Sequence, residues 1–493
     1  MAGFIPIEEP RRAPPRGFAL WQLGFRPFYL LASVFASLSI ALWAAQSAGW
    51  IRPLLPSPLW HAHEMVFGYT LAVIVGFLFT AGRNWTNRPT PTGATLAALA
   101  GWWLAGRVLV LTPYAGAAAV VNATFPLAAA LALAIPFWAA RNRRNYFFVA
   151  LLVLLALANA TIHAANAGVL TLPGALGVQV ALDVVIFVMA VMGGRVIPMF
   201  TNNGVPGAGA LRDARLERIA LGSVLVLLAA DALQLRGAAM AALLAFAALA
   251  HGTRLALWHP WRTRRTPLVW SLHVAYAWIV GHLALRALAE FGLVVPTLAT
   301  HALTVGALGG LTMAMMTRTA RGHTARPLRA DRADVACYTL VLLAALLRVV
   351  VPLVAPGAWL AAVVASAAAS SASSSAARSA IVAPRHHRRP GRTMAASSGA
   401  RMKVGGAGTR AIVTVEWGTS PSPYTLESRC SNSCCTPTTN SRSGPPSMAP
   451  SSTASSSPSS SRRPVWWSPP SCRATPCSSP PARSRPRRPS TSR

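Results

Sequence analysis

The sequence predicts an all-α fold, a polytopic membrane helix bundle of about 12 transmembrane helices followed by a low-complexity tail. Of its 493 residues, 53% are hydrophobic and only 12% are charged, whereas soluble domains carry about 25% charged residues. The apolar residues form runs of about 20, the length that crosses a bilayer as a helix. Residues 1–429 contain one cysteine, Cys337. These features exclude a soluble enzyme and a secreted disulfide-rich protein.

Eleven complete spans are expected, and a twelfth begins near residue 358. The connections between them are short and contain Pro, Gly or Arg, as turns do. Pro198 is expected to end one span, because the residues after it have the composition of a turn. The predicted ranges are 28–50, 60–82, 92–112, 115–140, 146–169, 175–198, 216–235, 237–258, 268–290, 296–318 and 335–355.

The composition changes near residue 365, which divides the chain into three parts. Residues 1–17 are predicted to be a cytoplasmic N-terminal segment, 18–365 the helix bundle, and 366–493 a Ser/Pro/Arg-rich tail. Residues 361–493 contain no Phe and only one Leu, Leu426, so we expect this part to be disordered. The twelfth helix is therefore expected to be truncated. A reading-frame shift is one explanation, and a genuine basic tail is the other.

The net charge of +33 is typical of nucleic-acid binding, but the positions of the arginines favour a membrane protein. Of the 27 arginines before residue 361, 21 lie in the N-terminal segment and in every second loop. The remaining loops hold only Arg52 and Arg236. The positive-inside rule then places the N-terminus in the cytoplasm. We expect the lipid bilayer to be the partner of this chain, with no nucleic acid.

Polar residues within the spans indicate function, because a charge near the bilayer centre costs about 2.5–3.5 kcal/mol on insertion scales. The topology places nine such residues at a similar depth in the extracytoplasmic half. Neutral imidazole is the commonest metal ligand and can hold haem iron axially. Cationic side chains at that depth can bind haem propionates. The nine residues are His61, His63, Glu64, Arg107, His163, Asp183, His282, Arg286 and His301.

These residues predict a site for haem or copper. The predicted cofactor-binding residues are His61, His63, His163, His282, His301, Arg107 and Arg286, and the predicted metal ligands are His61, His63, His301, Glu64 and Met316. Three simpler interpretations stay open. A histidine within a span often only bonds a neighbouring helix. Methionine often only fills gaps in packing. The two arginines could pair with Glu64 or Asp183.

The spacing of His61 and His63 restricts what they can bind together. Residues i and i+2 of a helix are 200° apart, so these imidazoles face opposite sides. They cannot share one metal ion unless the first turn is unwound. Glu64 lies on the same face as His61 and is expected to orient it as a carboxylate partner.

Several stretches of the chain resemble the NnrS family of bacterial membrane proteins. The most distinctive is Trp60-His61-Ala62-His63-Glu64-Met65, and others lie at 23–28, 76–81, 84–86, 193–201, 281–286, 301–307 and 316–318. The resemblance covers roughly residues 18–360. It implies a bacterial cytoplasmic (inner) membrane protein of twelve helices that holds haem and copper. It also implies a link to denitrification and to protection from nitric oxide and nitrosative stress.

Two functions are consistent with these observations. The first is a haem and copper protein that binds nitric oxide or keeps it from iron centres. The second is a secondary transporter with an intramembrane His/Arg/Asp substrate site, since a twelve-helix bundle also suits transport. Enzymatic reduction of nitric oxide is a weaker third hypothesis, because it needs a route for electrons that the sequence does not display. We therefore predict no catalytic residues.

Overall fold

The computed structural model describes residues 19–323, 327–382, 401–405, 410–416 and 424–429. The chain divides into two compact units, residues 1–387 and 388–493. In its described part the first unit is helical, which confirms the predicted fold class. The described part of the second unit is an antiparallel sheet in the order β1-β2-β3, which the sequence analysis did not predict. The predictions for residues 1–17 and for most of the tail lie outside the described residues.

Twelve long helices make up the described part of the first unit, as predicted. Three of them run continuously through π-helical segments. The helices and strands are α1 (Phe25–Ser47), α2 (Ser57–His63) with η2 (Glu64–Thr70) and α3 (Leu71–Thr86), α4 (Gly93–Leu109), α5 (Ala115–Ala139), α6 (Phe147–Asn166), α7 (Gly174–Gly204), α8 (Ala214–Ala232), α9 (Ala238–Leu257), α10 (Pro267–Ala289), α11 (Pro296–His301) with η5 (Ala302–Gly309) and α12 (Gly310–His323), α13 (Arg332–Ala345) with η6 (Leu346–Val350) and α14 (Val351–Val354), α15 (Trp359–Val382), β1 (Arg401–Gly405), β2 (Arg410–Glu416) and β3 (Tyr424–Arg429).

Nine of the described helices are long and apolar enough to cross a membrane. The other three are α4 with 17 residues, α8 with several charged residues and the serine-rich α15. Large apolar side chains such as Leu131, Ile135 and Leu249 are exposed on the outside of the bundle. Exposed apolar surface of this extent suits lipid rather than water. The chain is therefore a multi-pass membrane protein.

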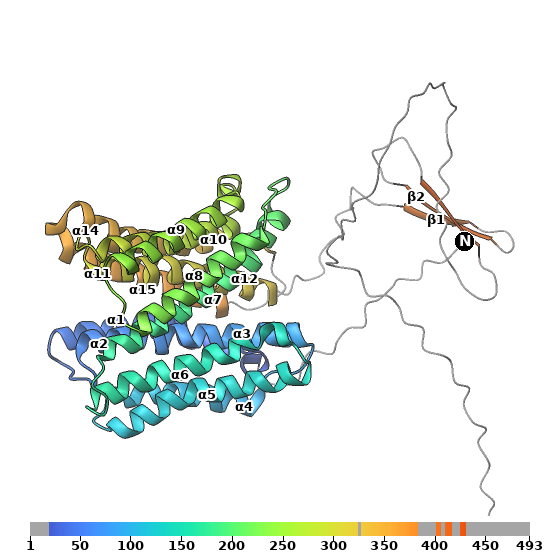
Figure 1. The fold of residues 1–493 in the computed structure, drawn as a ribbon. Helices are drawn as coiled ribbons and strands as arrows, with labels where there is room; N and C mark the ends of the chain where they lie inside the picture. The colour runs from blue at the N-terminus through green and yellow to red at the C-terminus, as the bar shows by residue number, and fades with distance from the viewer. Residues whose placement is uncertain (1–18, 324–326, 383–400, 406–409, 417–423, 430–493) are drawn as a thin grey trace, which may run out of the picture. The chain divides into compact units, whose positions relative to one another are not determined.

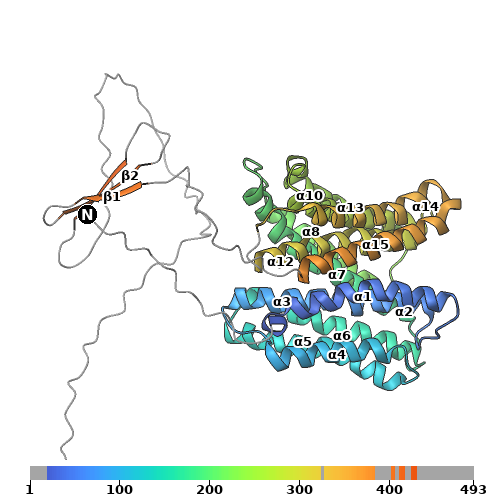
Figure 2. The ribbon, with the colours of Figure 1, turned by 180° about the vertical axis from the view of Figure 1, so that it is seen from behind.

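The helices form two groups that meet through α7 and through the packing of α1 against α15. Helices α1 and α3 to α6 lie together, and α8 to α15 form the second group (Figure 1; Figure 2 shows the reverse side). Because successive helices are antiparallel, their connections collect at two ends. We call the end that holds the α1–α2, α10–α11 and α14–α15 connections the histidine end. The opposite end, where most loop arginines lie, is called the arginine end.

Three helices change from α to π geometry near the histidine end. The π-helical segments are η2, η5 and η6, and each interrupts or extends an α-helix. A π turn inserts an extra residue, which rotates the following side chains to a new direction, and such turns occur frequently at functional sites. All three segments line the same cavity. The backbone geometry alone therefore indicates that this cavity is a candidate functional site.

Two helix ends differ from the sequence-based prediction. Helix α7 continues through Pro198 to Gly204, because neighbouring helices support a proline within a membrane span. The predicted turn residue Asn202 instead uses its side chain to bond both backbone groups of Ala210. The predicted boundary near residue 365 falls inside α15. Alanine favours helix, and the Ser366 hydroxyl is satisfied by the Ala344 carbonyl at 2.8 Å.

Close contact between α6 and α7 depends on a glycine. A Cβ atom on Gly177 would lie 2.5 Å from the Ala158 carbonyl oxygen and 2.6 Å from Ile162 Cγ1. We expect Gly177→Ala to lower the free energy of unfolding by about 1–3 kcal/mol, because backbone atoms cannot move aside easily. Gly101→Ala is the matched control, since nothing lies within 4 Å of that position. Thermal unfolding in detergent should separate the two variants, and equal stability would contradict this packing.

Candidate functional site

Two of the predicted histidines, His61 and His301, line one cavity at the histidine end. This histidine cavity has a volume of about 140 Å³. Its lining includes the guanidinium of Arg348 and the side chains of Tyr69 and Met65, while α15 closes one side with small residues. No carboxylate is among the lining residues that the structure describes. The cavity therefore presents nitrogen donors and one permanent cation to whatever enters it.

Hydrogen bonds fix which nitrogen of His301 is available. Its Nδ1 lies 2.6 Å from the Thr297 carbonyl oxygen. A carbonyl can only accept, so Nδ1 carries the hydrogen and Nε2 keeps a lone pair. The His61 ring stacks on Trp43 with centroids 4.6 Å apart, and its buried Nδ1 has no partner among the described residues. Both imidazoles can therefore act as ligands in the same cavity.

His63 faces the other side of its helix, as the 200° separation predicts. Its Nδ1 lies 2.7 Å from Glu64 Oε1, and the same oxygen accepts a hydrogen bond of 2.5 Å from Arg107 Nη1. Arg107 Nη2 also donates to Asn122 Oδ1. Glu64 therefore orients His63, and the prediction that it orients His61 is wrong. His63 and Arg107 hold the Glu64 carboxylate on their own side of the helix.

His163 joins His63 in this second site. The two rings lie 5.2 Å apart between centroids at an angle of 84°. Each ring has a buried Nε2 that lacks a hydrogen-bond partner within the described part of the chain. Since Glu64 already holds Nδ1 of His63, the free Nε2 of that ring carries a lone pair. A carboxylate behind an imidazole is the usual support of a metal-ligating histidine.

His282 and Arg286 belong to a third group of residues, which does not line the histidine cavity. His282 Nδ1 donates to the Ala299 carbonyl at 2.7 Å, which leaves its buried Nε2 without a partner among described residues. Arg286 pairs with two buried carboxylates, Asp231 through Nη2 and Asp183 through Nη1 at 3.6 Å. The ion-pair interpretation is thus observed for Arg286 as well as for Arg107. Neither arginine lines the histidine cavity.

The predicted residues therefore divide among three sites and do not form one ring. Among the residues that the structure describes, no group of three or more His, Cys, Asp or Glu side chains could hold a metal ion. Met316 lies 15 residues beyond His301 on one continuous helix, which is roughly 20 Å along the axis. It cannot share an ion with His301, and its side chain is buried in packing.

The sequence analysis missed three residues that contribute to these sites. Arg348 falls within the predicted span 335–355 and received no role in the prediction, although it lines the histidine cavity. Asp231 was overlooked, although a carboxylate inside the predicted span 216–235 is a usable signal. Asn122 offered no comparable signal, because a single amide in an alanine-rich helix is unremarkable until its contact with Arg107 is seen.

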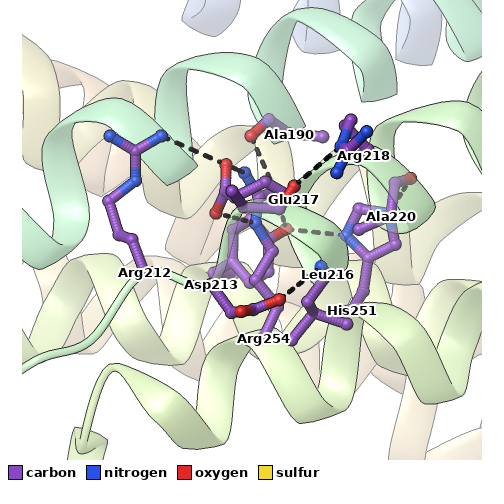
Figure 3. A network of polar contacts seen from close by, with 11 residues as sticks. Ala190, Arg212, Asp213, Leu216, Glu217, Arg218, Ala220, His251 and Arg254 are labelled. Atoms are coloured by element: carbon purple, nitrogen blue, oxygen red, sulfur yellow. Dashed lines mark hydrogen bonds and ion pairs between the residues drawn. The ribbon is translucent and has the colours of Figure 1, made fainter. Parts of the chain in front are cut away.

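The arginine end contains a polar network with a different character (Figure 3). Arg254 is 1% exposed and forms a bidentate pair with Glu217, at 2.8 and 2.7 Å. Its Nη1 donates to the Ala190 carbonyl and to the Tyr276 hydroxyl at 2.9 and 2.7 Å. A Cβ atom on Gly194 would overlap Arg254 Nη2. The network thus links the four helices α7, α8, α9 and α10. It also requires glycine at position 194, because a larger side chain would displace Arg254.

The buried histidines of the arginine end have partners for both ring nitrogens. His251 bonds the Tyr276 hydroxyl at 2.6 Å and a backbone carbonyl of α8 at 3.0 Å. His273 contacts the Val269 carbonyl at 3.0 Å and the Thr201 hydroxyl at 3.3 Å. Satisfied imidazoles of this kind hold helices together. The unsatisfied nitrogens of His61, His63, His163 and His282 stand out against them.

The fold and these sites define a class, a multi-pass helical membrane protein with available imidazoles at one end. The NnrS protein family model matches residues 19–376, so the chain belongs to the NnrS family. Membership places it among proteins of the nitric oxide response. The match reaches beyond residue 360 and includes part of α15. A search of the curated proteins found no match.

The ion pair between Glu64 and Arg107 provides a test of the second site. Replacing Glu64 by Gln removes the charge that balances a buried guanidinium, which typically costs about 3–5 kcal/mol. We expect Glu64→Gln to lower stability by that amount in detergent. Glu290→Gln is the control, because Glu290 accepts only a backbone hydrogen bond from Gly237 in the described contacts. A Glu64→Gln protein as stable as the control would contradict the geometry.

Proposed function

We propose that this protein binds haem and copper in the bacterial inner membrane and acts in the nitric oxide response associated with denitrification. It binds nitric oxide or protects iron centres from it, with the arginine end in the cytoplasm. Family membership supports the general role. The observation that carries the finer proposal is the set of buried imidazole nitrogens without partners at the histidine end. Leaving such groups buried and unpaired is unfavourable, so a ligand explains them.

The donors around the histidine cavity are of the types that haem uses, and the cavity of about 140 Å³ would have to widen to admit a porphyrin. His61 and His301 offer nitrogens from two different helices, and Arg348 supplies a cation to the same cavity for a propionate. Trp43 and Met65 give the apolar contact that a porphyrin requires. Haem held by His61 or His301 would supply an iron atom to which nitric oxide can coordinate.

The site of His63 and His163 suits copper. Imidazole is a good ligand for copper, and copper(I) accepts as few as two nitrogen donors. Glu64 and Arg107 fix the ring of His63, so its Nε2 is held in one direction. In this proposal His61 and His63, which project from opposite faces of α2, serve different metals. His61 and His301 hold haem, and His63 and His163 hold copper.

Replacing the histidines one at a time tests this division. His61→Ala and His301→Ala should remove most of the haem absorbance in the Soret region, while copper content stays near the native value. His63→Ala and His163→Ala should do the opposite. The measurements are optical spectra and metal analysis of purified full-length protein. His273→Ala is the matched control, because that imidazole is buried and satisfied.

The proposal would be wrong if all four variants at the histidine end kept full haem and copper. Unselective loss of both metals, with stability unchanged, would contradict the division into two sites. A variant that fails to fold is recognised by comparison with the His273→Ala control in the same thermal unfolding measurement.

A specific observation also favours the second candidate function, secondary transport. The cluster of Asp183, Asp231 and Arg286 is buried within the bundle, and both carboxylates leave an oxygen without a partner among described residues. Charged groups buried at such depth are common along substrate and proton routes. Asp231→Asn should then abolish solute or proton flux into vesicles. Asp213→Asn, at the exposed start of α8, is its control.

A further inference from the structure

A second cavity, the apolar cavity, lies between the two groups of helices. Its volume is about 90 Å³, and its lining comes from α1, α3, α7, α10, η5 and α12. Val73, Val188, Met189, Met192 and Met315 are typical of the side chains that face it. Almost all of its surface is carbon or sulfur, in contrast to the histidine cavity.

Two polar side chains, Tyr29 and Thr312, are found in the described lining of the apolar cavity. The Tyr29 hydroxyl faces the side chain of Thr319. The Thr312 hydroxyl donates to the Leu308 carbonyl at 2.8 Å and therefore accepts from the Tyr69 hydroxyl at 2.6 Å. A buried water needs two to four polar partners. The described lining does not offer them, so the cavity is expected to be dry.

The two cavities follow one another along the same helices. His61, Met65 and Tyr69 line the histidine cavity, and Val73 and Phe77 continue along the same face into the apolar cavity. On the facing helix, Leu308 lines both cavities. The hydrogen bond between Tyr69 and Thr312 lies at this boundary, since Tyr69 lines one cavity and Thr312 the other.

We propose that the apolar cavity holds a small uncharged gas molecule and passes it across the Tyr69–Thr312 boundary into the histidine cavity. Dry apolar cavities bind small apolar molecules and xenon. Anions such as nitrite are excluded, because the lining cannot replace the hydrogen bonds that they lose on leaving water. We infer that the gas bound in the apolar cavity is nitric oxide, because nitric oxide is uncharged and dissolves in hydrocarbon. That choice rests on the proposed function, whereas the preference for an apolar gas rests on the cavity itself.

Xenon tests the cavity without haem, copper or nitric oxide. The full-length protein, labelled with carbon-13 at the methionine methyl groups, is observed by NMR as xenon pressure rises. Met189, Met192 and Met315 should shift in a saturable way. Met199, which is 47% exposed, and Met240, which is buried elsewhere, should not. Equal shifts at all five methionines, or no saturable shift at the first three, would overturn the proposal.

A filled cavity provides the matched comparison. Val188→Trp should abolish saturable xenon binding, because the indole occupies the space. Val226→Trp makes the same change at an exposed position of α8 and should leave xenon binding intact. If Val188→Trp fails to fold, the methionine shifts of the unaltered protein still decide whether the apolar cavity binds xenon. A bound phospholipid chain that blocks xenon until the lipid is removed would show that the cavity belongs to the bilayer and overturn the proposal.

The boundary is tested separately in haem-loaded protein. Tyr69→Phe and Thr312→Val each remove the hydrogen bond between the cavities and should leave xenon shifts in place. We expect both to raise the rate at which nitric oxide rebinds ferrous haem after flash photolysis. Unchanged rates with normal xenon binding would overturn the passage between cavities. If no haem binds at all, the proposed function fails while the xenon result still decides the gas cavity.

Discussion

The constraint on which this structure depends is that a polar group inside a membrane bundle must find a partner within the protein or in a ligand. An unsatisfied buried donor or acceptor costs about 1–3 kcal/mol. At the arginine end the chain meets this constraint internally, since Arg254 and His251 use their polar atoms within one network. At the histidine end, His61, His63 and His163 each have a buried ring nitrogen without a hydrogen-bond partner among the described residues. The same physical rule thus distinguishes the satisfied imidazole of His251 from the three imidazoles at the histidine end.

Buried ion pairs decide which imidazoles become available. Arg107 holds Glu64, and Glu64 in turn holds one nitrogen of His63, so the opposite nitrogen points away in a fixed direction. The π-helical segment η2 begins at Glu64, immediately after His63. The 200° separation of His61 and His63 on α2 directs them into different sites, and the ion pair fixes the ring of His63. The two imidazoles therefore project from opposite faces of one helix into separate sites.

The two cavities, in the proposed gas route, differ sharply in the polarity of their linings. A neutral gas partitions into hydrocarbon and meets carbon and sulfur side chains such as Val188 and Met189 first. Beyond the Tyr69–Thr312 hydrogen bond the surroundings change to imidazole and guanidinium. Charged or strongly hydrated molecules cannot follow the same route, because desolvation in an apolar cavity is costly. In the proposed gas route, the order of the cavities therefore selects entering molecules by their polarity.

The sequence by itself determined the membrane class, the twelve helices and the opposite faces of His61 and His63, because hydrophobic run length and helical periodicity are local properties. Only the tertiary structure decided that Glu64 serves His63, that Asp231 joins Arg286, and that His61 meets His301 across a cavity. These pairings join residues up to 240 positions apart. They depend on how helices rotate and pack against one another, and π-helical turns alter that rotation in ways that no periodic pattern records.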